Sequence, residues 1–376
     1  MFVGVNMSRT TSPTQETGMK ILAIDLGKSK SVACVYSVET AESRFYKVGT
    51  SPGQLHELIL KVRPDRIVIE VCSAAGWVAD LVGTIGIELQ VANTAAPAWR
   101  WSNTKRKTDR DDALRLAQLS ALEQLPRVMI PKRDVRQWRA LIRYRHHLVR
   151  RRTQLRNRIR ALFDREGLTL PTGKQCWTNA GIAMLREWAR SLDEAPDQEL
   201  WRGELACELE ILQMAELLIA RVEAKLDGLA EANTACQLLQ SIPGVGPRLA
   251  EIVVAVLDDA SRFQKGKQVG SYAGLTPRQY QSGDCDRQGR ISHQGNPLLR
   301  SLLVEVSWVG LQYNPWMRAV YEQVRRGSPT RKKIAIVAVA RRLLIRCWAM
   351  LRDGVPWRPP KTEPIPSRTC GVVGAH

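Results

Sequence analysis

The sequence has too few acidic residues to balance its basic ones, and it lacks the patterns typical of secreted or membrane-spanning proteins. Its 376 residues include 56 lysines and arginines against 37 aspartates and glutamates, which gives a formal net charge of +19. No apolar run is long enough to span a bilayer, and residues 1–18 carry no secretory signal. We therefore expect a polyanionic partner. Nucleic acid is the favoured one, and an anionic membrane surface is the weaker alternative.

Zinc and ATP sites are also missing from the sequence. None of the eight cysteines belongs to a C-x-x-C pair or stands near histidine at zinc spacing, which argues against structural zinc. Cys34 and Cys72 lie in apolar runs, so we expect reduced, buried thiols of the kind found in the cytosol. The G-x-x-x-x-G-K-[ST] phosphate loop does not occur, so no ATP site is expected.

Residues 19–130 have the pattern of a mixed sheet. Three β runs are followed by helical and strand segments in alternation, which predicts an α/β domain with helices flanking the sheet. The expected strands are 20–27, 31–38, 44–48, 66–72 and 88–92, and the expected helices are 52–62, 77–85 and one from about 108. Residues 1–18 have no period, so we interpret them as a disordered leader, with Met19 as an alternative start to Met1.

Residues 131–233 are predicted to form a basic helical region. The stretch 132–165 carries 13 lysines and arginines but two acids, an imbalance that favours contact with RNA or DNA. The arginines expected to make this contact are Arg150, Arg151, Arg152, Arg156 and Arg160. From 205 to 226, leucine or isoleucine recurs every seven residues. This spacing predicts either an antiparallel or intersubunit coiled coil, or an amphipathic helix packed on its own domain.

Residues 234–357 form a third predicted module, which is helical apart from two connections. The turn Pro243-Gly-Val-Gly246 lies between two helical runs and resembles a helix–hairpin–helix grip on phosphate. An ordinary tight connection between helices is the simpler alternative. Residues 276–296 are predicted to be a polar, glycine-bearing loop, and residues 358–376 are expected to be disordered.

Four acidic residues occupy positions where a charge calls for explanation. Asp25 and Glu70 lie inside apolar strands, where an unpaired charge is costly. Asp109 and Asp112 are three residues apart, so they share a face of the predicted helix. If the strands are neighbours and the helix crosses them, the four acids converge and require a divalent cation, magnesium or manganese. Taken singly, each acid also fits a structural role, such as Asp109 as a helix N-cap completed by Asp112.

A hydroxyl group among arginines marks the third module. Three arginines flank Ser282 along the chain: Arg278, Arg287 and Arg290. Because guanidinium groups stabilise charge on phosphoryl oxygens, Ser282 is a candidate nucleophile, although its spacing alone favours a turn. Ser292 is a second available hydroxyl or a cap for the following helix. His293 is either a base or merely solvated.

Taken together, these residues resemble the DEDD transposases of the insertion sequence 110 family. The resemblance covers about residues 19–357. It rests on Asp25 in an Ile-Asp-Leu-Gly-Lys strand, Glu70 in Val-Ile-Glu-Val, and four further segments: Lys107-Thr-Asp-Arg-Asp-Asp-Ala113, Ser241-Ile-Pro-Gly-Val-Gly246, Tyr272-Ala-Gly-Leu-Thr-Pro-Arg278 and Arg290-Ile-Ser292. Each segment alone is weak, but their combination is highly specific. His293 departs from the lysine that is common in the family at this point.

The resemblance implies a fold, α/β followed by α. A RuvC-like domain with a ribonuclease H fold would occupy residues 19–130, a helical coiled-coil region 131–233 and a mostly helical C-terminal transposase domain 234–357. The metal-binding tetrad would be Asp25, Glu70, Asp109 and Asp112. Ser282 would be the nucleophile, forming a transient 5′-phosphoserine link with DNA.

The resemblance also implies partners. These are donor and target DNA, a structured bridge RNA that selects both by base pairing, and further copies of the chain, as dimers that assemble into a tetramer. The protein would act in the prokaryotic cytoplasm, in association with the nucleoid.

Two rival functions remain: a RuvC-like metal-dependent nuclease without a covalent intermediate, and a non-catalytic scaffold that binds RNA or DNA.

Overall fold

The computed structural model describes residues 18–94, 108–282 and 285–359. They fall into two compact units, one ending at Arg136 and the other beginning at Gln137. The predicted disordered leader and tail lie almost wholly outside the described residues. No helix within the described ranges is long and apolar enough to cross a bilayer.

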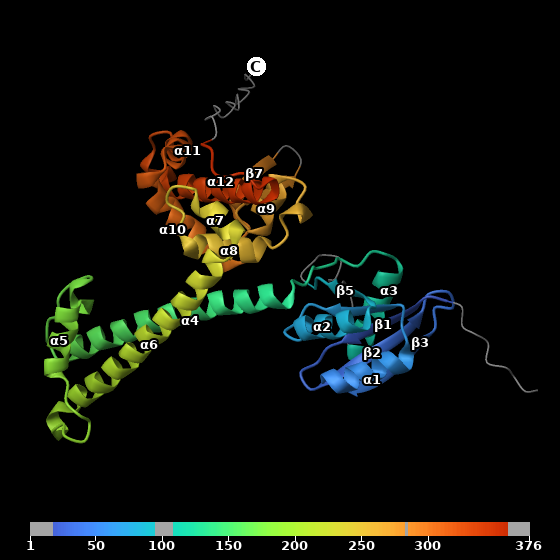
Figure 1. The fold of residues 1–376 in the computed structure, drawn as a ribbon, viewed down its shortest axis with the longest axis horizontal. Helices are drawn as coiled ribbons and strands as arrows, with labels where there is room; N and C mark the ends of the chain where they lie inside the picture. Colours follow the sequence, from blue (N-terminus) through green and yellow to red (C-terminus); the bar gives the residue numbers. More distant parts are fainter. Residues whose placement is uncertain (1–17, 95–107, 283–284, 360–376) are drawn as a thin grey trace, which may run out of the picture. The chain divides into compact units, whose positions relative to one another are not determined.

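The first unit is built on a mixed five-stranded sheet, as predicted (Figure 1). The strands are β1 (Lys20–Asp25), β2 (Lys30–Ser37), β3 (Ser43–Gly49), β4 (Arg66–Glu70) and β5 (Glu88–Ala92). Their spatial order is β3-β2-β1-β4-β5; the first three strands form an antiparallel meander, while β4 and β5 run parallel to β1. At the first turn, a Cβ atom on Gly27 would meet the Lys30 carbonyl, so glycine permits the close approach of the chain there.

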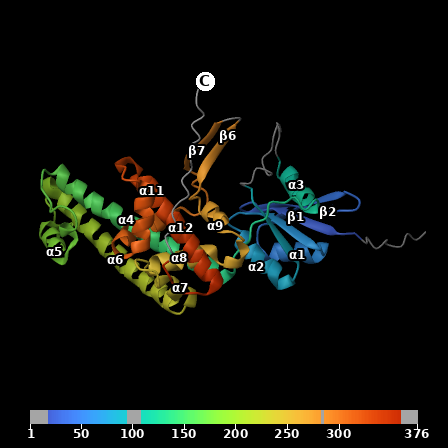
Figure 2. The same ribbon diagram turned by 90° about the horizontal axis from the view of Figure 1, so that it is seen from above.

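Helices cover both faces of this sheet (Figure 2). Helices α1 (Pro52–Val62) and α2 (Ala75–Ile85) pack on the face that carries Leu22 and Ile24. Helix α3 (Asp109–Ala121) packs on the other face, against Ile21 and Ala23. Side chains along β1 alternate between the two faces, as they do in any strand that is buried on both sides.

Buried polar contacts fix α3 on its face of the sheet. Arg66, at the start of β4, donates to the carboxylates of Glu88 and Glu123, and also to the carbonyl of Ser120 at the end of α3. The Ser120 hydroxyl in turn donates to Gln90 on β5, at 2.8 Å. Arg66 is 9% exposed and Ser120 is fully buried, so a displacement of α3 would leave buried polar groups of these two residues without partners.

In the second unit, two long helices form an antiparallel pair, α4 (Arg133–Arg165) and α6 (Leu200–Glu231). The heptad residues Leu205, Leu212, Ile219 and Leu226 are all buried, which agrees with an antiparallel coiled coil within one chain. Ion pairs join the two helices in opposite order along each: Arg145 with Glu223, Arg156 with Glu216, Arg158 with Glu208 and Arg165 with Glu204. The basic surplus of α4 is therefore partly balanced by acids from α6.

Short elements lie at the far end of this pair: η2 (Gln175–Trp177), α5 (Asn179–Trp188) and η3 (Asp197–Glu199) (Figure 1). The remaining elements form the C-terminal part of the second unit, in which the buried face of α12 (Lys332–Asp353) is the centre of the largest apolar core. They are α7 (Thr234–Gln240), α8 (Pro247–Leu257), η4 (Ala260–Arg262), α9 (Gly266–Tyr272), β6 (Pro277–Ser282), β7 (Cys285–Ile291), α10 (Pro297–Tyr313), α11 (Pro315–Arg325) and η5 (Pro329–Arg331).

Two sequence predictions about this architecture are wrong. The polar loop expected at 276–296 is largely a β-hairpin, β6–β7, in which Tyr280 is paired with Arg287. Its strands are polar on both sides and carry no apolar alternation, which is why the strand pattern was not apparent. Cys72 is exposed, because β4 ends at Glu70 and the thiol lies beyond the strand; Cys34 is buried as expected.

Glu251, on α8, is expected to make the stability of the second unit depend on pH. Its side chain is 1% exposed, and burial raises its pKa from 4.5 to about 7, although Arg248 lies 3.3 Å away. Arg145, Asp227 and Glu223 are the other charged groups that act on it. Since the folded protein holds this proton more tightly than the unfolded chain, the free energy of unfolding should fall as the pH rises from 4.5 to 7.

In the wild type, this fall in the free energy of unfolding should amount to up to about 3 kcal/mol. We expect Glu251→Gln to abolish it, because glutamine does not titrate. The variant should therefore be more stable than the wild type at pH 8. Urea unfolding followed by circular dichroism at pH 5 and pH 8 measures the difference. The control is Glu204→Gln, which removes a half-exposed carboxylate from α6 and should keep the wild-type pH dependence. An unchanged pH dependence in Glu251→Gln would contradict the assignment.

Candidate active site

Two of the predicted acids end neighbouring parallel strands. Asp25 is the last residue of β1 and Glu70 the last residue of β4. The strands pair in parallel, with Ile24 opposite Ile69, so both acids come at the same edge of the sheet, one residue beyond this pair. The sequence analysis made convergence of the acids conditional on these strands being neighbours, and the structure meets that condition.

Both acids belong to the face that α3 covers. Ala23 and Val68 pack with α3 in one core cluster, whereas Ile24 and Ile69 belong to the cluster on the opposite face. Side chains two residues apart in a strand share a face. Asp25 and Glu70 therefore follow Ala23 and Val68 on the α3 side.

The first turn of α3 brings the other two acids towards this edge. Asp25 is opposite Val32 in the β1–β2 register, and Val32 packs with Ala113 of α3. Asp112 precedes Ala113 and is only 6% exposed, while Asp109 lies one turn earlier and is exposed. Within the described residues, no three or more carboxylate, cysteine or histidine groups stand close enough together to hold a metal ion. The four acids thus share a region of the unit without forming a closed ligand cage.

Another residue caps α3. Thr108 is the N-cap and its hydroxyl accepts from the Asp111 amide, while the Asp111 carboxylate accepts from the Thr108 amide and hydroxyl at 3.1 and 2.6 Å. This reciprocal capping box shows that the alternative role of Asp109 as N-cap, completed by Asp112, is wrong. The physical reason is that the extended backbone required of an N-cap occurs at Thr108, one residue earlier than expected.

Ser282 lies in the second unit, at the end of β6 and opposite Cys285. Arg278, Arg287 and Arg290 of the same hairpin are exposed. Tyr280 is 59% exposed. Its ring would be 3.0 Å from a Cβ atom on Gly289, so it lies close over a glycine of the facing strand. Tyr280 becomes a candidate for contact with a ligand only once the pairing of β6 with β7 is known.

The residues after the hairpin have structural roles. The Ser292 amide donates to the Thr276 carbonyl, and the N-cap of α10 is Asn296, so the proposed capping role of Ser292 is wrong. His293 is exposed, with φ = 57°.

In the Pro243-Gly-Val-Gly246 turn, Gly244 has φ = 90° and a Cβ atom there would be 3.1 Å from the Gly310 Cα. The close packing of two backbones accounts for Gly244 without phosphate.

The predicted nucleic-acid contacts on α4 fall into two groups. Arg150 and Arg151 are exposed, Arg152 is half-buried, and none of the three has an ion pair or hydrogen bond within the described residues. Arg156 and Arg160 both stack on the Trp177 ring, with guanidinium carbons 5.1 and 5.5 Å from its centroid. The first group is free to meet a polyanion, whereas the second is engaged inside the protein.

Two family models match the chain. A transposase model of the DEDD IS110 type matches residues 22–166, and the model described as the transposase IS116/IS110/IS902 family matches residues 236–322. The first match spans all four acids of the sheet unit, and the second spans Ser282.

Several known proteins are similar over most of the chain. The transposase of insertion sequence element IS1111A from Coxiella burnetii is 29% identical over 89% of this chain and 90% of that protein. A probable family 20 transposase from Pseudomonas aeruginosa is 27% identical over 91% of this chain and 100% of that protein. The pilin gene-inverting protein of Moraxella lacunata is 28% identical over 67% of this chain and 68% of that protein.

The capping box gives a stability prediction. Thr108→Ala should lower the free energy of unfolding by about 1 kcal/mol, because it leaves amides of the first turn of α3 without an acceptor. Urea unfolding measures this loss. Combining it with Asp111→Ala should cost less than the sum of the two single changes, since each residue completes the other's capping. Full additivity would show that the two residues act independently.

Proposed function

This chain belongs to the IS110 family of insertion-sequence transposases, and from that premise we propose that it cuts and rejoins DNA through a transient bond between Ser282 and a 5′ phosphate. The observation that carries the proposal is the arrangement of the sheet unit. Two acids end adjacent parallel strands on the face where α3 begins with two more. The mixed sheet with helices on both faces supports a RuvC-like fold for this domain.

Asp25, Glu70, Asp109 and Asp112 would hold magnesium or manganese. The donor set fits such an ion, because it consists of carboxylate oxygens, which are hard ligands, and because like charges drawn together need a counter-charge. When bound, the metal would stabilise negative charge on the oxygens of the reacting phosphate. The buried position of Asp112 and the strand-end positions of Asp25 and Glu70 would hold these three groups at the fixed edge of the sheet.

The hydroxyl of Ser282 would supply the nucleophile. Its oxygen forms a bond to phosphorus, the bond from phosphorus to the 3′ oxygen breaks, and the hydroxyl proton is lost to a base or to solvent. A 3′ hydroxyl of another strand then attacks the same phosphorus and releases the serine, so the bond count is conserved and no ATP is consumed. The exposed Arg278, Arg287 and Arg290 support this step, since guanidinium groups stabilise phosphoryl charge.

The partners proposed are donor and target DNA, a structured bridge RNA, and further copies of the chain assembled as dimers and then a tetramer. The net charge of +19 and the exposed Arg150 and Arg151, which have no ion pair with any residue that the structure describes, support binding of a polyanion. The relatives' names, transposases and a gene-inverting protein, support DNA as the substrate.

Trapping of covalent adducts tests the nucleophile. Wild-type protein with DNA carrying the element's ends should give protein–DNA adducts that survive denaturation, and Ser282→Ala should give none. Ser292→Ala, the control, removes a nearby hydroxyl and should keep the adducts. Undiminished strand cutting by Ser282→Ala would instead establish the rival nuclease, in which water attacks.

Adjacent aspartates of α3 test the proposed metal site. Asp112→Asn should lower strand cutting about 100-fold or more, because it removes a proposed ligand that stabilises phosphoryl charge. Asp111→Asn, its matched control, alters an exposed capping residue and should cost stability while leaving most of the cutting. Equal cutting by both variants and the wild type would contradict the proposed metal site, and no cutting by any of the three would favour the non-catalytic scaffold.

A further inference from the structure

A cavity of about 470 Å³ lies in the sheet unit beyond the ends of β1 and β4. The residues that matter in its lining are Leu26, Lys28, Thr50, Cys72, Ser73 and Trp77. We refer to it as the strand-end cavity. Its size falls within the range of about 300–1,000 Å³ typical of small-ligand sites.

The strand-end cavity begins where the candidate acids end. Leu26 directly follows Asp25, and Cys72 is two residues beyond Glu70. Both segments leave the sheet at the same edge, because β1 and β4 are parallel neighbours. The acids are on the α3 side of the sheet and Trp77 belongs to α2 on the other side, so a DNA strand with one phosphate at the acids would pass over the ends of β1 and β4 to place its next nucleotide in this cavity.

The lining combines one cation, hydroxyl groups and an aromatic ring. Lys28 is exposed and, within the described residues, forms no ion pair or hydrogen bond; the same is true of Ser73. The Thr50 hydroxyl is held by Ser31 at 2.7 Å. Trp77 is half-buried, with part of the indole packed on the core. A free ammonium group suits a phosphate, and an indole face suits a nucleobase.

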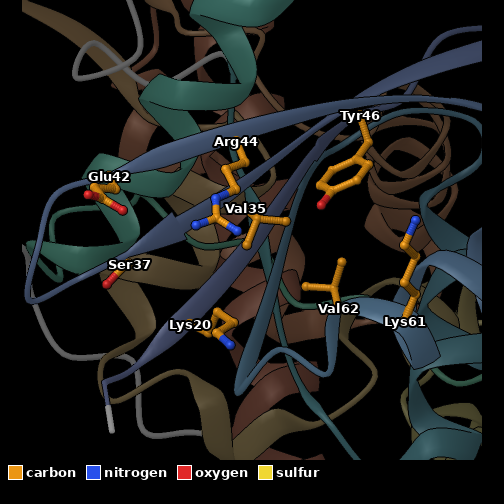
Figure 3. A pocket seen from close by; sticks show the side chains of 8 residues that line it. All are labelled: Lys20, Val35, Ser37, Glu42, Arg44, Tyr46, Lys61 and Val62. Atoms are coloured by element: carbon orange, nitrogen blue, oxygen red, sulfur yellow. The ribbon is translucent and has the colours of Figure 1, made fainter. Parts of the chain in front are cut away.

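A second cavity in the same unit is a less suitable site (Figure 3). It has a volume of about 200 Å³ and is lined by Lys20, Glu42, Arg44, Tyr46 and Lys61, among others. It lies beside Lys20, the first residue of β1, whereas Asp25 is the last residue of that strand. The second cavity and Asp25 are therefore at opposite ends of β1. Glu42 contributes a negative charge, and the Lys61 ammonium lies 5.7 Å from the centre of the Tyr46 ring. One of its cations, Lys61, thus already has a π partner, and Glu42 lowers the positive charge of the lining.

We propose that the strand-end cavity binds the nucleotide adjacent to the phosphate that is cut, with a phosphate at Lys28 and the base against Trp77. This subsite rests on the proposed DNA-cutting function of the neighbouring acids. It holds the strand by its backbone and by stacking, so it is tolerant of sequence.

The exposed Cys72 thiol reports on occupancy of the strand-end cavity. We would measure the rate at which iodoacetamide labels Cys72 in the full chain, by peptide mass spectrometry, with rising amounts of a short single-stranded oligothymidylate and magnesium. Cys207, the exposed thiol on α6, is the reference. Saturating oligothymidylate should slow labelling of Cys72 relative to Cys207 roughly tenfold, because a bound nucleotide covers the thiol.

Two lysine variants separate a local contact from general charge. Lys28→Gln should raise the oligothymidylate concentration needed for half-protection roughly tenfold, which is the effect of losing one charge-assisted hydrogen bond. Lys28→Arg should restore most of the affinity. Lys61→Gln removes the same charge from the second cavity. It should change the oligothymidylate concentration needed for half-protection of Cys72 by less than about twofold. Equal effects of Lys28→Gln and Lys61→Gln, or Cys72 still freely labelled at saturation, would overturn the subsite.

This test is separate from that of the proposed function, since labelling requires no bond to be cut. Serine-dependent adducts without protection of Cys72 would overturn the subsite alone. Protection of Cys72 that depends on Lys28, in a protein whose Ser282→Ala variant cuts DNA normally, would overturn the covalent mechanism and leave the subsite in place.

Discussion

The attachment of α3 to the sheet is the constraint on which the candidate site depends. Asp25 and Glu70 are placed by the strands themselves, but Asp112 reaches their edge only because Ala113 packs on Val32 and the far end of the helix is held at Ser120. The side chains of Arg66 and Ser120 are buried, so loss of their hydrogen bonds would leave buried polar groups unpaired. Polar contacts at one end of α3 thus determine where its acidic first turn lies.

The helical pair of the second unit shows how a strongly basic helix is kept folded. Four arginines of α4 are paired with glutamates of α6, and Arg160 stacks on an aromatic ring. These contacts reduce the charge available to an external polyanion, which leaves Arg150 and Arg151 as the exposed cations of the predicted set. A count of charges along one segment overestimates its nucleic-acid contacts when the neutralising acids come from another helix.

Elements with strong local periodicity could be predicted from the sequence, and features that depend on distant partners could not. Helix α1 and strand β5 have the predicted bounds, because apolar spacing and flanking turns define them locally. The β6–β7 hairpin was missed because its strands are polar, and the cap of α3 was misplaced by one residue. The sequence placed Asp25 and Glu70 in apolar strands but left their adjacency as a condition, which the parallel pairing of β1 and β4 meets. The strand-end cavity depends on how three separate turns meet, which no local pattern indicates.

The topology of the sheet explains why both the acids and the strand-end cavity occur at one edge. From β1 the chain turns back to β2 and β3 on one side, and it later returns through α1 to β4 and β5 on the other. Connections therefore diverge between β1 and β4, and in open sheets flanked by helices such a point leaves a crevice beyond the carboxyl ends of the strands. Side chains placed there, such as Asp25, Glu70 and Lys28, can meet a ligand without disturbing the apolar core beneath them. The same divergence that makes room for a nucleotide thus brings the carboxylates to its border.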